Sequence, residues 1–460
     1  MSFIAIDLTL FVLFTLIAIL FLYKHKKNLE RQGILYLYKT KIGIKIINYT
    51  SKKYSKLLKA LEYLIIFCGF ILMILMIYLL VKFSITYIGS SYLAKAIKIP
   101  VLLPLFPYIP SLFKLDFLPP FYFTYWVIII AIVAIPHEFF HGIFAKLSKI
   151  KVHSTGFGFL GPFLAFFVEP DEKQMNKIGK KEQMAILASG TFANILVTIV
   201  FALIMWAFFS LAFIPAGVQF NTYAITPINA SQITGISNVT FANITYGEIN
   251  VNNKTYFITL DIVSLVKEGK VSAFLAYDNS PAFNAQLKGA ISQIDNVKIN
   301  SYNDLNQTLN NYGSGDQIKI TTIIGKTGTK TKEYNIQLGE RNGKAFLGIG
   351  IIPNKPSGIM GFFYSFISKI KHPEVYYQSR IGDFGIFIND LLWWLIIINL
   401  SVALMNMLPL GIFDGGKFFL LTIWGITKSK KAGEIAYKIS TWVLLLLVLA
   451  LMLKWALAIF

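Results

Sequence analysis

The sequence is poor in cysteine and in charged residues, and both shortages restrict the class of protein. The single cysteine, Cys68, excludes an intramolecular disulfide, and its apolar surroundings favour a packing or lipid-facing residue over a nucleophile. Charged residues form only 14% of the 460 residues, whereas soluble domains average about 25%. Hydrophobic residues form 55% of the chain. This composition excludes an ordinary soluble globular protein and indicates an integral membrane protein.

Acidic residues are scarce relative to basic ones, 23 against 43, which gives a formal net charge of +20. In a soluble protein such an excess would suggest binding to nucleic acid. Here the lysines gather in short segments beside apolar runs, as they do in cytoplasmic loops, and no nucleic-acid-binding motif accompanies them. We therefore expect the lipid bilayer as a partner and no nucleic acid.

Apolar segments of about 20 residues, the length of helix that crosses a bilayer, recur along the chain. They cover residues 3–23, 61–81, 121–147, 184–214, 384–426 and 435–460. We expect a polytopic α-helical membrane protein with six crossings, of which the fifth is long enough to be broken within 406–416. The lysine-rich stretch 24–59 predicts a cytoplasmic loop and places both termini outside. Residues 82–120, rich in proline and aromatics, predict an interfacial or re-entrant segment.

The segment 215–356 is polar, alternates as strands do, and predicts an α+β domain inserted between membrane spans. Its five N-x-S/T sequons agree with the lysine distribution in placing it outside the cytoplasm. They begin at Asn229, Asn238, Asn243, Asn253 and Asn306. The chain then divides into an N-terminal pair of spans with the interfacial segment (1–120), the first half of the membrane core (121–214), the inserted domain (215–356) and the second half of the core (357–460).

The third span contains the sequence His-Glu-Phe-Phe-His at residues 137–141. Residues four apart share one face of a helix, so the imidazoles of His137 and His141 can bind one metal ion. Glu138 can accept the proton of an attacking water without being a ligand. Mere packing is a poor alternative, since an ionisable residue near the bilayer centre costs about 2.5–3.5 kcal/mol or more. At 1.5 Å per residue, His141 lies about 10 Å inside the cytoplasmic end of the span.

A hydrolytic zinc site normally has three protein ligands, so a third must come from elsewhere in the chain. Asp414 is the best candidate, because an acidic residue in an apolar segment needs a cation. Asp383 and Asp390 are rivals, but they lie near the outer end of the same segment. The alternative for Asp414 is a helix cap beside the two glycines that follow it.

These residues resemble the site-2 protease family of intramembrane zinc metalloproteases, which combines H-E-x-x-H with a later N-x-x-P-x-x-x-x-D-G-G. Asn406, Pro409 and Asp414 match the second pattern, as do the two glycines after Asp414. The resemblance implies zinc as the cofactor, His137, His141 and Asp414 as its ligands, and Glu138 as the catalytic base. The family's G-x-x-x-N element is similar to Gly190 and Asn194, with Thr191 where a proline is usual. Asn194 and Asn406 then bind substrate or the oxyanion, or form helix–helix hydrogen bonds.

Two further segments resemble parts of this family. Residues 156–170 are similar to its membrane-re-entrant β-loop, to which a substrate could be added as a strand; an amphipathic loop is the alternative. Residues 279–305 resemble a PDZ domain, with a turn, a helix, a strand and a second helix in order. A PDZ-like domain implies binding of peptide tails and a filter for substrates shortened outside the membrane.

The sequence thus predicts an intramembrane zinc metalloprotease acting on transmembrane proteins near the cytoplasmic side, in regulated proteolysis. General clearance of membrane stubs is an alternative within the same enzyme class. A catalytically inactive scaffold that binds peptides through the PDZ-like domain is an alternative from another class. A metal transporter is disfavoured because the polar residues are concentrated at one place instead of being spread through several spans.

Overall fold

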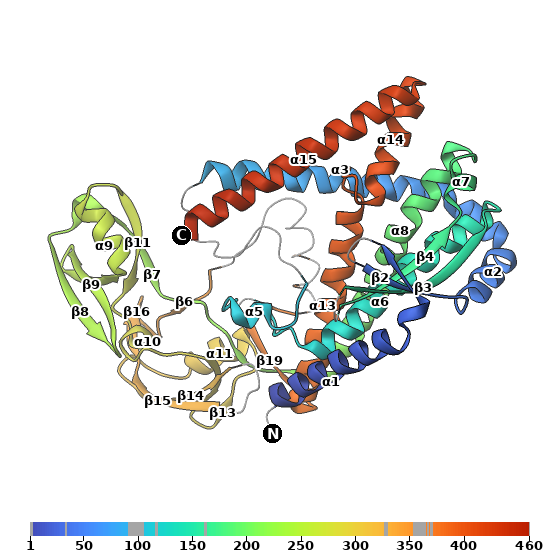
Figure 1. Ribbon diagram of the computed structural model, residues 1–460. Coiled ribbons are helices and arrows are strands. Elements are labelled where there is room, and N and C mark those ends of the chain that lie inside the picture. The colour runs from blue at the N-terminus through green and yellow to red at the C-terminus, as the bar shows by residue number, and fades with distance from the viewer. Residues whose placement is uncertain are drawn as a thin grey trace. The chain divides into compact units, whose positions relative to one another are not determined.

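The structure is a computed structural model that describes residues 3–32, 35–90, 105–115, 118–160, 163–325, 330–352, 365, 368 and 371–459. It divides into two compact units (Figure 1). Unit 1 comprises Met1–Met205 and Asp390–Phe460, and unit 2 comprises Trp206–Asn389. The expected domain boundary between residues 356 and 357 lies outside the described residues.

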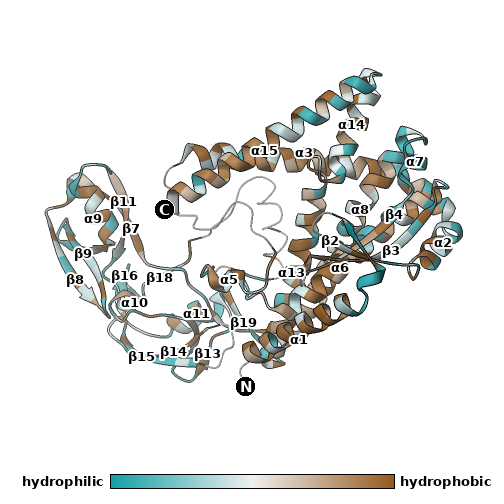
Figure 2. Cartoon of the chain, viewed as in Figure 1, coloured by the Kyte–Doolittle hydropathy of each residue, from teal (hydrophilic) through white to brown (hydrophobic). Residues whose placement is uncertain are grey.

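In the described part of the chain, six helices are long and apolar enough to cross a membrane, which confirms the predicted number of spans. They are α1 (Phe3–Lys24), α3 (Ser55–Gly89), α6 (Phe123–Leu147), α8 (Lys180–Ala212), α13 (Gly382–Asn406) and α15 (Lys430–Ile459). Hydrophobic residues run along these helices, whereas the strands of unit 2 alternate between hydrophobic and hydrophilic residues (Figure 2). The chain is therefore a polytopic α-helical membrane protein with an inserted β-rich region.

The second span is longer than predicted, because α3 begins at Ser55 and continues to Gly89. The expected interfacial segment 82–120 thus starts inside a helix. Its residues 91–104 and 116–117 lie outside the described residues, and the remainder contains the short helix α5 (Ile109–Leu112). Near its end α3 packs against α15, where Tyr87 and Leu451 are both buried.

Helix α6, which contains both histidines of the motif, is capped by a residue of another helix. Tyr122, at the N-cap position of α6, makes no side-chain cap. Instead the carboxylate of Asp7 on α1 accepts the backbone N–H groups of Phe123 and Thr124 at 2.8 and 3.0 Å. The Tyr108 hydroxyl donates to the same carboxylate at 2.6 Å. Asp7 is fully buried, and a negative charge at a helix N-terminus is favourable.

The expected β-loop is part of a four-stranded antiparallel sheet. Its hairpin consists of β3 (Val152–Leu160) and β4 (Phe163–Pro170), with residues 161–162 outside the described part. Two strands from the N-terminal segment extend the sheet, β1 (Leu29–Gln32) and β2 (Leu35–Thr40), in the order β1-β2-β3-β4.

The stretch 24–59, expected as a basic cytoplasmic loop, is thus largely folded, and its cytoplasmic location stays a prediction. This stretch also contains η1 (Lys26–Asn28) and α2 (Ile44–Lys53) and the start of α3. The Lys39 ammonium joins the two hairpins, at 2.7 Å from Glu30 and 3.0 Å from Glu169. The lysine in the first hairpin thus neutralises a carboxylate in the second.

The predicted break in the fifth crossing is confirmed. Helix α13 ends at Asn406, and after a short turn α14 (Asp414–Thr427) begins. Glycine is required at position 415, because a Cβ there would lie 2.3 Å from the backbone carbon of Met407. The turn therefore folds tightly against the start of α14, and a side chain at 415 would open it.

Unit 2 contains two main sheets. The first is six-stranded, in the order β15-β14-β12-β5-β19 with β13 beside β12. Its strands are β5 (Phe213–Val218), β12 (Ala290–Ile294), β13 (Val297–Lys298), β14 (Gln317–Ile324), β15 (Lys330–Gln337) and β19 (Val375–Ser379). Helices α10 (Pro281–Asn284) and α11 (Tyr302–Leu309) lie between its strands in the chain. The order of turn, helix, strand and helix agrees with the expected PDZ-like pattern, and the PDZ resemblance itself stays a prediction.

The second sheet is five-stranded, in the order β7-β11-β10-β9-β8, and lies between β6 and α10 in the chain. Its strands are β7 (Ile225–Asn229), β8 (Gly235–Phe241), β9 (Ile244–Val251), β10 (Lys254–Ile258) and β11 (Ala273–Asp278). The remaining short elements are α7 (Glu172–Met175), β6 (Thr222–Tyr223), η2 (Ala230–Gln232), α9 (Leu260–Lys267), β16 (Gly339–Arg341), β17 (Lys344–Phe346) and β18 (Ile349–Gly350). The fully buried ring of Phe283 on α10 stacks on Phe257 of β10 at 4.7 Å, so aromatic packing joins this sheet to α10.

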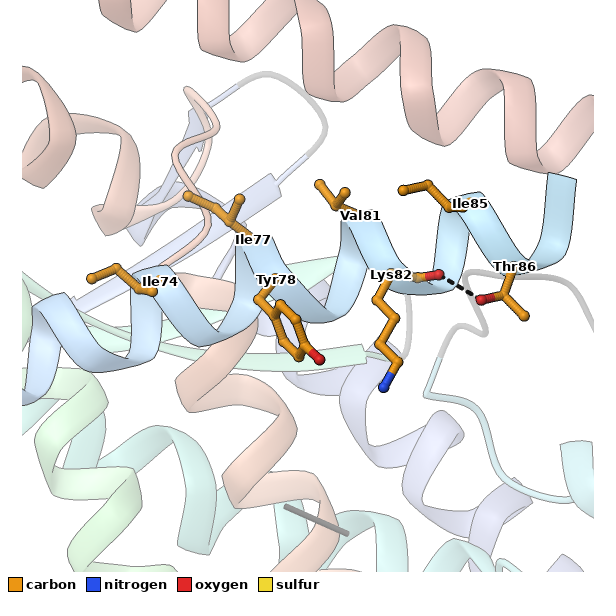
Figure 3. Close-up of a pocket in the computed structure, with 7 residues that line it drawn as sticks. All are labelled: Ile74, Ile77, Tyr78, Val81, Lys82, Ile85 and Thr86. Atoms are coloured by element: carbon orange, nitrogen blue, oxygen red, sulfur yellow. Dashed lines mark hydrogen bonds between the residues drawn. The ribbon is translucent and has the colours of Figure 1, made fainter. Parts of the chain in front are cut away.

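A groove of about 700 Å³ lies along the second half of α3 (Figure 3). Its described lining is mainly apolar, including Ile77, Val81 and Ile85, with Tyr78 and Lys82 on the same helix. None of these residues belongs to the polar cluster described next. An apolar helix surface of this kind is what a membrane span presents to lipid.

Candidate metal centre

Helix α6 brings the two histidines of the motif together as their spacing predicts. Their side chains extend from one face of the helix, and the Nε2 atoms of His137 and His141 lie 3.1 Å apart. The side chain of His137 is 8% exposed and that of His141 is 13% exposed. Two ring nitrogens therefore face one small space that is largely closed to solvent.

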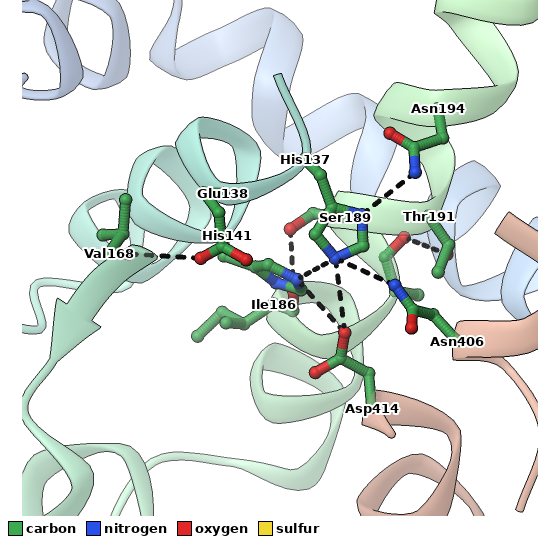
Figure 4. A network of polar contacts seen from close by, with 11 residues as sticks. His137, Glu138, His141, Val168, Ile186, Ser189, Thr191, Asn194, Asn406 and Asp414 are labelled. Atoms are coloured by element: carbon green, nitrogen blue, oxygen red, sulfur yellow. Dashed lines mark hydrogen bonds and ion pairs between the residues drawn. The ribbon is translucent and has the colours of Figure 1, made fainter. Parts of the chain in front are cut away.

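Asp414 completes this cluster from the other half of the chain (Figure 4). Its Oδ2 lies 3.2 Å from Nε2 of His141 and 3.6 Å from Nε2 of His137. Among the described residues, these three form the group of metal-ligating side chains whose ligand atoms lie within 4.8 Å of one another. The rivals Asp383 and Asp390 lie on α13 outside this group.

The helix-cap alternative for Asp414 does not fit the geometry. The N-cap position of α14 is Phe413, which makes no side-chain cap, and Asp414 is the first residue of the helix. Its carboxylate faces the two imidazoles instead of the backbone N–H groups of its own helix. The break between α13 and α14 therefore serves to direct this carboxylate at α6.

The outer hydrogen bonds of the histidines favour metal binding. Nδ1 of His141 lies 2.7 Å from the carbonyl oxygen of Ile186 on α8, and a carbonyl can only accept. Nδ1 of His141 must therefore carry the hydrogen, which leaves a lone pair on Nε2, the atom that faces Asp414. Two imidazole nitrogens and one carboxylate oxygen form a donor set that suits zinc in a hydrolase.

Gly190 on α8 keeps the space in front of both imidazoles clear. A Cβ at this position would lie 2.3 Å from Nε2 of His141 and 2.7 Å from Nε2 of His137. Both distances are shorter than any ordinary carbon–nitrogen contact. Only glycine leaves the two ligand atoms accessible to an ion, so the residues present fit a metal at this place.

Glu138 lies beside this group without belonging to it. Its Oε2 accepts the backbone N–H of Val168 on β4 at 3.1 Å. The half-buried carboxylate is thus held between the helix that carries the histidines and the outer strand of the four-stranded sheet. This position, next to the ligands but outside the ligand group, suits a proton acceptor.

The two asparagines singled out in the sequence both contact His137, but at opposite ring nitrogens (Figure 4). Nδ2 of Asn194 lies 3.3 Å from Nδ1, and Nδ2 of Asn406 lies 3.4 Å from Nε2. Asn406 is therefore on the side of the ligand atoms, whereas Asn194 is on the far side. The Thr191 hydroxyl, at the position where a proline is usual, donates to the carbonyl of Ala188 at 2.8 Å, and α8 continues through this position without interruption.

Three contributions to the site were not foreseen from the sequence. The carbonyl of Ile186 and the N–H of Val168 are backbone groups, which no residue type announces. Val168 lies inside the segment recognised as a β-loop, and that resemblance is the only signal that could have indicated it. Gly190 is part of the G-x-x-x-N pattern, but the pattern does not show that this glycine leaves space beside the two Nε2 atoms. That space depends on how closely α8 approaches α6.

Six membrane-length helices in the described part of the chain, together with a convergent His-His-Asp group on α6 and α14, define a polytopic membrane protein with a candidate metal centre. The chain belongs to peptidase family M50, the site-2 protease family, whose model matches residues 125–449. This range includes both halves of the His-His-Asp group. No protein of curated function matches the sequence. Membership in this family of zinc metalloproteases supports a membrane metalloprotease function.

Proposed function

We propose that this protein is an intramembrane zinc metalloprotease that hydrolyses peptide bonds of transmembrane proteins near the cytoplasmic side of the bilayer. The observation that carries the proposal is the convergence of His137, His141 and Asp414. These residues come from two helices separated by most of the chain, so local structure alone cannot explain their proximity. Leaving three such groups together in an apolar helical unit without a cation would be costly.

Each residue of the site then has a defined task. His137, His141 and Asp414 would hold the zinc ion, and Glu138 would accept the proton of the attacking water and pass it to the leaving amide nitrogen. Bound zinc supplies Lewis-acid activation of the water and of the scissile carbonyl. Val168 holds the Glu138 carboxylate in place through its N–H group. Asn406, on the ligand side of His137, is positioned to donate to the substrate carbonyl oxygen.

The substrate binds in extended form along strand β4. Strand β2 already pairs with one edge of β3, and β4 pairs with the other, so β4 is an edge strand of the sheet. Because the Val168 N–H of β4 points to Glu138 instead of to β3, the outer edge of β4 faces the proposed base. A peptide added to this edge would have its backbone hydrogen bonds satisfied, and its scissile bond would be unwound next to Glu138.

The orientation of the chain follows from charge and sequons. Lys146 in the last turn of α6, and Lys149 and Lys151 directly after it, indicate the cytoplasmic side. On this topology both termini and the PDZ-like domain lie outside the cytoplasm. All five sequon asparagines of unit 2 are exposed, as acceptors of glycans must be. The PDZ-like domain would bind peptide tails and admit substrates that have already been shortened outside, in regulated intramembrane proteolysis.

The first test is elemental analysis of zinc in the purified full-length chain and in two variants. Wild type should contain about one zinc per chain, Asp414→Ala should contain clearly less, and Asp383→Ala should resemble wild type. Asp383 is a matched control because it is an exposed aspartate on the adjacent helix α13. A well-folded wild type without zinc would contradict the proposal and favour the inactive scaffold. Zinc retained fully in Asp414→Ala would remove Asp414 from the ligand set.

The second test is cleavage of a transmembrane reporter by Glu138→Gln. Loss of a general base typically lowers the rate by about 100- to 10,000-fold, and zinc content should remain that of wild type because Glu138 is outside the ligand group. Undiminished cleavage by this variant would exclude Glu138 as the base. Comparison of membrane fragments in cells with and without the protein then separates release of a specific factor from general clearance of stubs.

A further inference from the structure

Helix α8 places three residues, spaced four positions apart in the sequence, against the two histidines. Ile186, Gly190 and Asn194 lie on one face of α8, because residues four apart are aligned along a helix. Ile186 supplies a carbonyl to Nδ1 of His141 at 2.7 Å, and Asn194 places its amide 3.3 Å from Nδ1 of His137. Gly190, between them, leaves the space next to both Nε2 atoms free.

The contact between Asn194 and His137 has a chemical requirement when Nε2 binds a metal. The nitrogen that binds the metal must offer its lone pair, so the hydrogen of a neutral imidazole is then on Nδ1. Nδ1–H is a donor, and the Nδ2 group of Asn194 is also a donor. Two donors cannot form a hydrogen bond, so the amide must present its oxygen to His137 instead.

The surroundings of Asn194 permit this change. Asn194 is fully buried, and its Oδ1 has no hydrogen-bond partner. An amide group has nearly the same shape after a half-turn, so Oδ1 and Nδ2 exchange places within the same volume. Oδ1 then accepts from Nδ1–H of His137 and gains the partner that it lacks.

We propose that Asn194 is a positioning residue that accepts the Nδ1 hydrogen of His137 and so directs the Nε2 lone pair of His137 at the metal. Asn194 thus does for His137 with a side-chain oxygen what Ile186 does for His141 with a backbone carbonyl oxygen: each accepts the Nδ1 hydrogen. One face of α8 thus selects the metal-binding tautomer of both histidines, with the Gly190 gap between the two acceptors. This inference rests on the proposed zinc site and differs from a direct contact of Asn194 with substrate, which Asn406 is better placed to make.

The test compares zinc affinity, measured by competition with a chelator, in the detergent-solubilised full-length chain. Partners of metal ligands typically contribute 10- to 100-fold in metal affinity, so Asn194→Ala should weaken zinc binding by about that factor. Asn194→Asp keeps an acceptor oxygen at the same place and should bind zinc nearly as wild type does. The absorption spectrum of the cobalt-substituted protein is a second readout, which should change in Asn194→Ala because His137 is no longer held in one orientation.

Asn399 on α13 provides the matched control. It is fully buried, and its Oδ1 likewise has no hydrogen-bond partner, but its Nδ2 donates to the carbonyl of Leu395 on its own helix at 2.8 Å. Asn399→Ala should therefore leave zinc affinity and the cobalt spectrum unchanged, while it removes an equivalent amide from the membrane unit. The thermal unfolding temperature of the zinc-free proteins shows whether either alanine variant is misfolded.

The outcomes distinguish this inference from the proposed function. Wild-type protein without zinc would contradict the proposed function itself. If Asn194→Ala has the zinc affinity and the cobalt spectrum of the wild type, only the positioning role of Asn194 is overturned. Equal loss of zinc in Asn194→Asp and Asn194→Ala would also overturn it, because the acceptor oxygen would then be irrelevant. Unchanged zinc affinity with lost cleavage in Asn194→Asp would return Asn194 to the substrate-binding role as a donor.

Discussion

The two units of this protein use polar residues in opposite ways. Among the described residues, most of the buried polar side chains lie in unit 1, and some of them, such as His137 and Asn194, belong to one cluster. In unit 2 the buried positions are mainly aliphatic and aromatic, and exposed polar residues are abundant. We therefore expect substitutions in unit 1 to act through individual polar atoms near the candidate metal centre. In unit 2 we expect them to act on folding stability, through the volume that they remove from the core.

The largest effect is expected in the core of unit 2, where Phe283→Ala removes a fully buried ring that stacks on Phe257. Such truncations typically cost about 3–5 kcal/mol of folding free energy. Limited proteolysis of the full-length chain should show faster cleavage within unit 2, with zinc content unchanged. Leu275→Ala, at a position 56% exposed on β11, is the control and should have little effect. Loss of zinc in Phe283→Ala would show that the two units are not energetically separate.

Gly190→Ala should lower the folding free energy less than Phe283→Ala does, but it should weaken zinc binding directly. The added methyl group would collide with both Nε2 atoms, and overpacking of this kind costs about 1–3 kcal/mol. Zinc affinity should fall by about 5- to 150-fold, as measured by chelator competition. Gly425→Ala on α14, where an added Cβ meets nothing within 4 Å, is the control. Zinc affinity equal to wild type in Gly190→Ala would contradict the clearance role.

The cap of helix α6 should have a moderate effect on stability. Asp7→Asn keeps one acceptor oxygen but removes the charge from the N-terminus of α6, and loss of a cap typically costs about 0.5–2 kcal/mol. The thermal unfolding temperature of the detergent-solubilised protein should fall. Thr9→Val on the exposed side of α1 is the control, since Thr9 bonds only to its own helix. An unchanged unfolding temperature in Asp7→Asn would contradict the cap role.

The smallest effect is a pH dependence in unit 2. The Tyr312 hydroxyl and the Lys319 N–H both donate to Asp295, and these hydrogen bonds hold the pKa of its carboxyl below the ordinary 3.8. Because the folded pKa is the lower one, the stabilisation is complete above the ordinary pKa and is lost as the pH falls through the folded pKa. The difference in unfolding temperature between wild type and Asp295→Asn should therefore be constant near neutral pH and shrink below about pH 4.

The control for this titration is Asp261→Asn, which changes an exposed aspartate in the first turn of α9. Its difference from wild type should be small across the same range. A wild-type advantage over Asp295→Asn that grows as the pH falls would have the wrong sign and would exclude the two hydrogen bonds as its source.

Local patterns were enough to predict the features that depend on neighbouring residues. The six spans follow from the length of apolar runs, and the pairing of His137 with His141 follows from helical periodicity. The break within 406–416 follows from the length of the fifth crossing, which exceeds that of one straight membrane-spanning helix. The strands within the first basic stretch were not predicted, because β2 pairs with β3, a partner more than 100 residues away, and β1 pairs with β2.

By itself, therefore, the sequence determined the class of protein, the membrane spans and the ligand types. Only the tertiary structure decided that Asp414, not Asp383 or Asp390, meets the histidines, and that Asn194 and Asn406 face opposite nitrogens of His137. The physical reason is that residue type and spacing describe one helix at a time. The distance between α6, α8 and α14, and hence which atom faces which, is set by the packing of helices that lie far apart in the chain.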